Sequence, residues 1–417
     1  MGQIGIYVTY VIMIFVVLGA LAAIRDSQQG MGKEFIEGIH CIGPTFIPVA
    51  GIMAALPYLS KFVESTFGPV FASIGADPAI GATTIIAVDM GGYQLAQVLA
   101  TTKENWLMAM VVGYMAGATI IFSIPVGLAM LQPKDHKYMA LGIMSGLLSI
   151  PIGVFVACAV LALGEPMVRD AIGSNLEANY QISLSFAVIL RNLFPLIIFC
   201  VVLALGLRFF PDKMIRGFLW FGRIMYGAIT MILAFSIVEY FTGFFTFVFG
   251  HWGFDPIIAD KADQFRALEI AGYGGIMLAG AFPMVYAIGK YLEKPVSALG
   301  RRFGLDTTGA AGMLAAAANI LAMYRLVAIM RPKDKVMCIA YAVCGAWVIG
   351  DHLAFTANFQ PTMIVAIMSG KFLGGVSGAL LARWLSVPKA IELGEQDFLE
   401  QSKAGDVNLG ALSGTVS

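Results

Sequence analysis

The chain has 417 residues, of which 59% are hydrophobic and only 12% are charged, and its mean hydropathy is +0.83. A soluble domain of this length would carry about twice as many charged residues, so the composition excludes a soluble protein and indicates many membrane spans. Lysine plus arginine equals aspartate plus glutamate, at 26 each, which excludes a basic surface for nucleic acid.

Hydrophobic runs long enough to cross ~30 Å of hydrocarbon predict about nine transmembrane helices. The first run begins directly after Gln3 with no basic residue before it, which predicts a membrane span and not a cleaved signal peptide. The predicted spans cover residues 4–24, 41–59, 106–131, 138–163, 182–207, 218–240, 272–288, 336–355 and 363–385. Residues 25–40 form the first polar loop of this scheme, and the tail from Ser386 is expected to be poorly ordered.

Two further segments, 78–100 and 307–330, are interrupted in the middle by polar residues. Each has about ten small or apolar residues before the interruption and about ten helix-forming residues after it. The interruption is Asp89-Met90-Gly91-Gly92-Tyr93 in the first segment and Asn319 in the second. We interpret both segments as re-entrant hairpins of two half-helices.

Short motifs recur in the same order in the two halves of the chain. Gly51-Ile52-Met53 recurs as Gly275-Ile276-Met277, Gly75-Ala76-Asp77 as Gly304-Leu305-Asp306, Gln132-Pro133 as Gln360-Pro361, and Ile143-Met144-Ser145-Gly146 as Ile367-Met368-Ser369-Gly370. All offsets lie between about 224 and 229 residues, which predicts an internal repeat. The predicted units are a first repeat over 1–163, a connecting helix over 182–209, a second, inverted repeat over 217–385 and a cytoplasmic tail over 386–417.

Positive charge indicates the orientation. With two hairpins and a cytoplasmic C-terminus, about seventeen of the 26 lysines and arginines fall inside and about five outside, whereas full crossings would divide the loop charges almost evenly. The sequence therefore predicts an all-α polytopic membrane protein, an inverted repeat of about nine transmembrane helices plus two re-entrant hairpins, with the N-terminus outside. Arg191, Arg223, Arg325 and Lys371 lie within or at the edge of spans. We expect Arg191 to snorkel or to pair with a carboxylate, and the other three receive no role here.

Asp89 is the first candidate for substrate binding. A ten-residue half-helix rises ~15 Å, half the hydrocarbon thickness, so hairpins from opposite faces would bring Asp89 and Asn319 near the midplane. Carboxylates are costly at that depth, and Gly91 and Gly92 would let backbone approach a ligand. Together with carbonyls at the end of the inbound half-helix, this favours a cation site. The alternative is a cap on the outbound half-helix.

Asp351 and His352 form a second candidate inside the predicted span 336–355, because two ionisable groups at membrane depth need each other, a substrate or water. His352 would be the pH-sensitive group. The alternative is a position near the solvated external end. Ser123 occupies the corresponding region of the first repeat, and Tyr93 and Trp347 could face an ammonium ion through cation–π contact, with core packing as their alternative.

The sequence has no Walker motif, dinucleotide-binding glycine pattern, zinc-ligand helix motif or serine elbow. Cys338 and Cys344 lack metal-ligand spacing. We therefore expect no cofactor, no metal site and no enzymatic activity, and the chain alone is not an ATP-driven pump.

Three motifs together resemble the ethanolamine-utilisation permease family, the H component of bacterial eut systems. They are Asp89-Met90-Gly91-Gly92, Phe122-Ser123-Ile124-Pro125-Val126 and Gly350-Asp351-His352-Leu353. The resemblance covers about residues 51–385. One departure is Ala318-Asn319-Ile320-Leu321 at the second interruption, where the family leads us to expect Asn-Asn-Ile-Pro.

The resemblance implies uptake of ethanolamine across the bacterial inner (cytoplasmic) membrane by facilitated diffusion, supplying ethanolamine catabolism in microcompartments. The implied partners are ethanolamine and the lipid bilayer, with no nucleic acid, and a homo-oligomer is left open. Three alternatives stay open: a sodium- or proton-coupled transporter of a small organic cation, an intramembrane enzyme that uses Asp351 and His352, and a receptor or scaffold that binds without flux.

Overall fold

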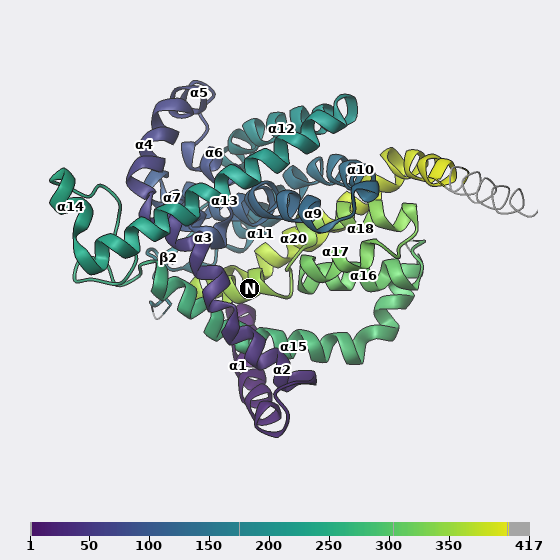
Figure 1. Cartoon of the computed structure of the whole chain (residues 1–417), viewed down its shortest axis with the longest axis horizontal. Coiled ribbons are helices and arrows are strands. Elements are labelled where there is room, and N and C mark those ends of the chain that lie inside the picture. The colour runs from purple at the N-terminus through teal and green to yellow at the C-terminus, as the bar shows by residue number, and fades with distance from the viewer. Residues whose placement is uncertain (1, 175, 303, 398, 400–417) are drawn as a thin grey trace, which may run out of the picture.

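The computed structural model describes residues 2–174, 176–302, 304–397 and 399 (Figure 1). Within these residues, the chain is helical apart from one two-stranded ribbon, so the predicted all-α polytopic class is confirmed. Eight helices in this part of the chain are long and apolar enough to cross a membrane, namely Gly2–Arg25, Gly30–Ala54, Lys103–Met130, Pro133–Gly164, Phe186–Phe209, Pro211–Thr242, Ala267–Tyr291 and Pro361–Leu385.

The N-terminal part of the chain consists of α1 (Gly2–Arg25), α2 (Gly30–His40), α3 (Ile42–Ala54), α4 (Leu56–Thr66), α5 (Gly68–Ser73), α6 (Pro78–Ile85), η1 (Val88–Met90), α7 (Gly92–Leu99), α8 (Lys103–Val112), the π-helix η2 (Gly113–Ser123), α9 (Ile124–Met130), η3 (Pro133–Asp135), α10 (His136–Leu147) and α11 (Ile150–Gly164). The predicted polar loop 25–40 is wrong, because most of it is α2. Gly32 and Gly38 allow α2 to pack closely: a Cβ at Gly38 would lie 2.5 Å from the backbone of Ala279.

The C-terminal part begins with the antiparallel ribbon β1 (Met167–Val168) and β2 (Tyr180–Gln181). It continues as α12 (Phe186–Phe209), α13 (Pro211–Thr242), α14 (Phe244–Phe249), α15 (Ala267–Arg302), α16 (Thr307–Ala318), α17 (Ile320–Val327), α18 (Pro332–Gly345), α19 (Asp351–Phe359), η4 (Pro361–Met363) and α20 (Ile364–Leu385).

The prediction of one continuous helix over 336–355 is wrong, since α18 and α19 are separated by residues 346–350. The predicted disordered tail is wrong for residues 387–397, which are helical; residues 400–417 lie outside the described part.

The first interrupted segment turns back on itself. Asp77, just before α6, accepts hydrogen bonds from the backbone N–H of Thr101 at 2.9 Å, the Thr101 hydroxyl at 2.6 Å and Asn105 Nδ2 at 2.9 Å. A continuous helix would hold residues 77 and 101 ~36 Å apart. The segment therefore enters and leaves the helical body at the same end.

The second interrupted segment behaves in the same way. Asp306 caps α16 by accepting from the N–H of Gly309 at 2.7 Å, and its other oxygen lies 2.9 Å from Nε of Arg331, which follows α17. Asp306 is the repeat counterpart of Asp77, which caps α6 through the N–H of Ala79. An aspartate thus joins the two arms of each hairpin at its open end.

The two open ends lie at opposite ends of the molecule. Lys103, beside the first hairpin, pairs with Asp170 of the β1–β2 region at 3.2 Å, and we call this the ribbon end. Asp135 pairs with Lys335, beside the second hairpin, at 2.5 Å, and we call this the tail end. The helix from Lys103 to Met130 joins the two ends and is ~42 Å long.

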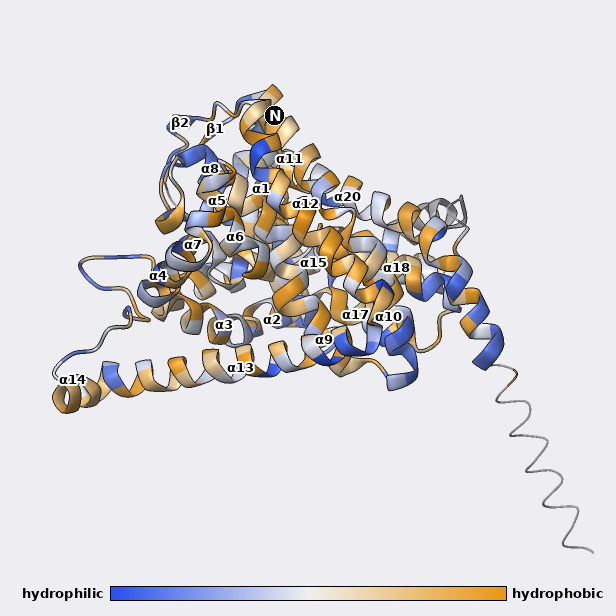
Figure 2. Ribbon diagram, turned by 90° about the horizontal axis from the view of Figure 1, so that it is seen from above, coloured by the Kyte–Doolittle hydropathy of each residue, from blue (hydrophilic) through white to orange (hydrophobic). Residues whose placement is uncertain are grey.

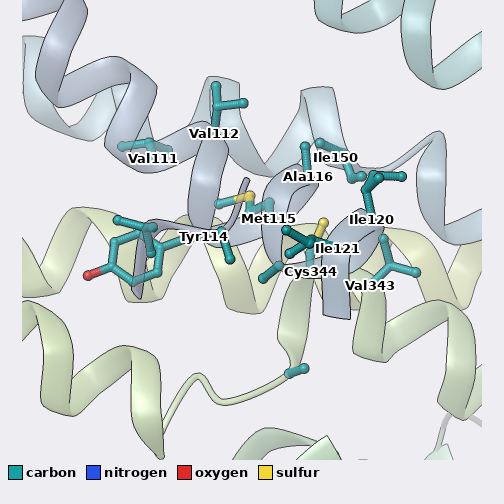
Figure 3. Packing of buried hydrophobic residues seen from close by; sticks show 14 of the residues in the cluster. Val111, Val112, Tyr114, Met115, Ala116, Ile120, Ile121, Ile150, Val343 and Cys344 are labelled. Atoms are coloured by element: carbon teal, nitrogen blue, oxygen red, sulfur yellow. The ribbon is translucent and has the colours of Figure 1, made fainter. Parts of the chain in front are cut away.

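The helix from Lys103 to Met130 lies at the centre of the molecule. Its most apolar stretch is 94% buried, against 17% for α1 and α13, which form the outside. Figure 3 shows side chains of η2, among them Met115 and Ile121, packed near Cys344 of α18. The outer helices carry mostly hydrophobic residues in Figure 2, and exposed apolar side chains such as Tyr7, Trp220 and Tyr226 cover them, as a lipid-facing surface requires.

Candidate functional site

The interruption of the first hairpin presents a free carboxylate. Helix α6 ends at Ile85, a short turn η1 carries Asp89, and Gly91 adopts φ +91° before α7 begins. A side chain at Gly91 would place its Cβ 2.7 Å from Ile52 on α3, so glycine is needed for both backbone shape and packing. The α7 N-terminus has no side-chain cap, so the alternative role of Asp89 as a cap is not observed.

A third interruption, which the sequence did not predict, lies between α18 and α19. Here Trp347 has φ +55°, and the N–H groups of Trp347 and Ile349 each donate at 3.0 Å to the carbonyls of Ala316 and Ala317 at the end of α16. The last carbonyls of a helix lack partners within it, and the turn formed by residues 346–350 supplies them here. These two hydrogen bonds to the tip of the second hairpin therefore keep residues 346–350 out of a helix, directly before Asp351.

Asp351 and His352 form the first turn of α19, where the helix dipole favours a negative side chain. Asp351 and Asp89 line the same cavity of about 40 Å³, together with Thr45 on α3 and Gly274 on α15. One oxygen of each carboxylate is buried and lacks a hydrogen-bond partner in the described part of the chain. Two carboxylates that line one cavity are an arrangement that favours a small cation as ligand.

His352 lies behind this cavity and is 1% exposed. Its Nε2 atom is 3.9 Å from Oδ2 of Asp89, and the rings of Tyr114 and Trp347 each lie 5.0 Å from the imidazole ring. The Tyr114 hydroxyl shares a 2.6 Å hydrogen bond with the Thr356 hydroxyl. His352 Nδ1 has no partner among the residues described, so one ring nitrogen remains available for a hydrogen bond.

Of the nine predicted site residues, Asp89 and Asp351 line the cavity and the other seven do not. Four of those seven, described next, have structural roles. Tyr93 stacks on Trp106 at 4.9 Å and accepts a 2.8 Å hydrogen bond from Gln360. Ser123 donates its hydroxyl to a carbonyl of its own helix, and Asn319 caps α17 by accepting from the N–H of Leu321 at 2.9 Å. Gly92 packs against the preceding turn, where a Cβ would lie 2.5 Å from the Ala87 carbonyl oxygen.

Lys371 is close to the site and was given no role from the sequence. It is 1% exposed, lies in α20, and donates a 3.0 Å hydrogen bond to the carbonyl of Tyr114. A lysine inside an apolar span was the available signal. Thr45 carried no comparable signal, because threonine is common in membrane helices.

A larger pocket of about 360 Å³ opens at the ribbon end beside α7, lined in part by Gln94, Asp255, Asp263 and Arg266. Gln94 is 4% exposed, and both atoms of its amide lack a partner in the part of the chain that is described. Burial raises the pKa of Asp255; the Arg266 guanidinium partly opposes this rise, and Asp263 adds to it. The pocket therefore offers polar groups to a cation that approaches the first hairpin.

Within the described residues, no group of three or more histidine, cysteine, aspartate or glutamate side chains is arranged to hold a metal ion.

Comparison with known proteins covers nearly the whole chain. The family model described as "Ethanolamine utilisation protein, EutH" matches residues 4–385. A protein of Listeria monocytogenes named "Probable ethanolamine permease EutH" is 35% identical over 91% of this chain and 93% of its own length. Proteins of the same name from Escherichia coli and Salmonella typhimurium are each 34% identical over 92% of this chain and 95% of their own length. No solved structure matches the chain.

Proposed function

Because this chain belongs to the EutH family of ethanolamine utilisation proteins, we propose that it carries ethanolamine into the bacterial cell across the cytoplasmic membrane. The related proteins are permeases and not enzymes, and the apolar helices make this chain a multi-pass membrane protein. We further propose that transport is facilitated diffusion by alternating access.

The observation that carries this proposal is the pair of carboxylates, Asp89 and Asp351, on one small cavity. An aliphatic amine is protonated at neutral pH, as lysine is, so ethanolamine arrives as a monocation. A cavity of about 40 Å³ has room for roughly three or four non-hydrogen atoms at about 10–15 Å³ each, which suits a molecule of this size. In our proposal the carboxylates bind the ammonium group, and His352 or Thr45 binds the hydroxyl group.

The proposed orientation places the ribbon end and the N-terminus outside and the tail end in the cytoplasm. The positive charge of the tail end supports this orientation. The pocket at the ribbon end, with Gln94 and Asp255, is then the external entrance. Met53 lines this pocket and would lie 3.5 Å from a Cβ at Gly91, so little more than the first hairpin separates entrance and cavity.

We also propose that the two halves are inverted copies whose hairpins meet at mid-membrane. Open ends at opposite ends of the molecule, each with a capping aspartate at the same repeat position, support this arrangement. Movement of the hairpins relative to the outer helices would expose the cavity to each side in turn.

Counterflow of labelled ethanolamine in liposomes that contain the purified chain tests the proposal. Vesicles preloaded with unlabelled ethanolamine should take up label transiently above its external concentration, and empty vesicles should not. Binding of label without counterflow would instead indicate a receptor or scaffold. Product formation in detergent would indicate an enzyme.

The alternative is a sodium- or proton-coupled transporter, favoured by the approach of His352 to Asp89, where a proton could be shared. Imposed gradients distinguish the two mechanisms. Only a coupled transporter accumulates ethanolamine against its own gradient when the membrane potential is held at zero.

A further inference from the structure

Lys371 is a buried ammonium group without an ionic partner within 4.0 Å in the part of the chain that the structure describes. Its single hydrogen bond goes to the carbonyl of Tyr114 in the π-helix η2. The other buried lysine, Lys335, is paired with Asp135. An isolated charge at this depth is costly, so it must be offset by charges nearby or by a function that requires it.

The surrounding contacts connect Lys371 to the cavity. The ring of Tyr114 lies 5.0 Å from that of His352, and His352 lies 3.9 Å from Asp89. Lys371 is therefore linked to the first carboxylate through Tyr114 and His352.

The charges around the cavity can be counted for the state in which both carboxylates and the lysine are ionised. In that state Asp89 on the first hairpin and Asp351 on α19, which line the cavity, each contribute one negative charge, and Lys371 on α20 contributes one positive charge. His352 on α19, Tyr114 on η2 and Cys344 on α18 also face this region and are neutral in this count. The sum is one negative charge, which a single monocation neutralises.

From this balance we propose that Lys371 is a built-in cation that takes the place of a co-transported ion, so that ethanolamine alone completes the charge of the site. The inference rests on the proposed function. Without Lys371 the site would hold two uncompensated carboxylates, and the substrate would neutralise only one. A sodium ion or a proton would then have to bind with it, and the variant would become a coupled transporter.

The test uses the full chain in liposomes with labelled ethanolamine, with the membrane potential clamped at zero and an inward sodium or proton gradient imposed. The wild type should only equilibrate. Lys371→Met, which keeps the length of the apolar stem, should accumulate ethanolamine up to about tenfold for a tenfold gradient, the limit for one-to-one coupling. Asp351→Asn combined with Lys371→Met restores one negative charge, so it should lose the coupling and only equilibrate ethanolamine, at a lower rate than the wild type because one carboxylate of the binding cavity is missing. Lys389→Met removes an exposed lysine near the tail end and serves as the matched control.

Equilibration without accumulation by Lys371→Met, under both gradients, would overturn the inference. If Lys371→Met is inactive, recovery of transport in the double variant supports charge balance, and failure of both variants overturns it. A wild type that shows no counterflow would instead overturn the proposed function, so the two failures are distinguishable.

Discussion

The Nε2 atom of His352 lies 3.9 Å from the Oδ2 atom of Asp89. His352 is on the first turn of α19, and Asp89 is on the turn between the half-helices of the first hairpin. Two helix interruptions from different halves of the chain therefore face each other across one small cavity. In a membrane, irregular backbone is tolerated where it is buried in protein or lines a cavity, and here it does both.

Asp89→Asn should abolish most transport. The substitution keeps the size of the side chain but removes one of the two charges that face the cavity, and losing one partner of a buried charge pair costs on the order of 3–5 kcal/mol. We expect kcat/KM for ethanolamine uptake to fall at least ~100-fold. Asp212→Asn, at the exposed start of α13, is the control. Uptake by Asp89→Asn at the wild-type rate would refute the assignment of the cavity.

Asp77→Asn should destabilise the first hairpin. Asp77 is 4% exposed and accepts hydrogen bonds from both arms of the hairpin, and an amide cannot accept all of them. We expect a loss of about 2–4 kcal/mol, measured as a lower Tm in detergent. Asp306→Asn makes the matched change at the second hairpin and should cost less, because its partner Arg331 is 57% exposed. Equal losses would contradict this explanation.

Gly91→Ala should distort the turn that carries Asp89. The glycine has φ +91°, and the added Cβ would lie 2.7 Å from Ile52. Strain of this kind costs about 1–3 kcal/mol, so a lower Tm and slower uptake should appear together. Gly272→Ala on α15 is the control, since nothing lies within 4 Å of the added atom. If Ile52→Ala, which removes the Cγ2 atom that the added Cβ would meet, partly rescues Gly91→Ala, the contact with α3 contributes to the strain.

The KM for ethanolamine should rise as the external pH falls, and Asp255 should account for part of the rise. Burial raises the pKa of Asp255, so this carboxylate is neutralised at a higher pH than an ordinary aspartate and stops attracting the cation at that point. Asp255→Asn should have a higher KM at neutral pH and a flatter profile, with kcat unchanged. An identical pH profile in the variant would exclude this pocket as the entrance.

Much of this architecture follows from local sequence alone. Small residues on both sides of Asp89 and Asn319 predicted segments that stop inside the membrane, and the bonds of Asp77 with Thr101 and of Asp306 with Arg331 show the chain returning to the same end in each. Length and hydropathy are properties of a single segment, so they determine which parts enter the bilayer. A lone carboxylate in such a segment is costly wherever it packs, and that cost singled out Asp89 without a structure.

Other features required the fold because their cause lies in another part of the chain. Residues 346–350 contain no proline, and the helix opens there because the last carbonyls of α16 accept from Trp347 and Ile349. That contact moves Asp351 and His352 from the last part of an expected helix, 336–355, to the start of a new one. The hydroxyl of Tyr93 is satisfied by Gln360, 267 positions away, and only the tertiary structure shows this contact. Ser123 and Asn319 are instead satisfied by residues close to them in the chain. A hydrogen bond needs two partners in space, and one chain position records only one of them.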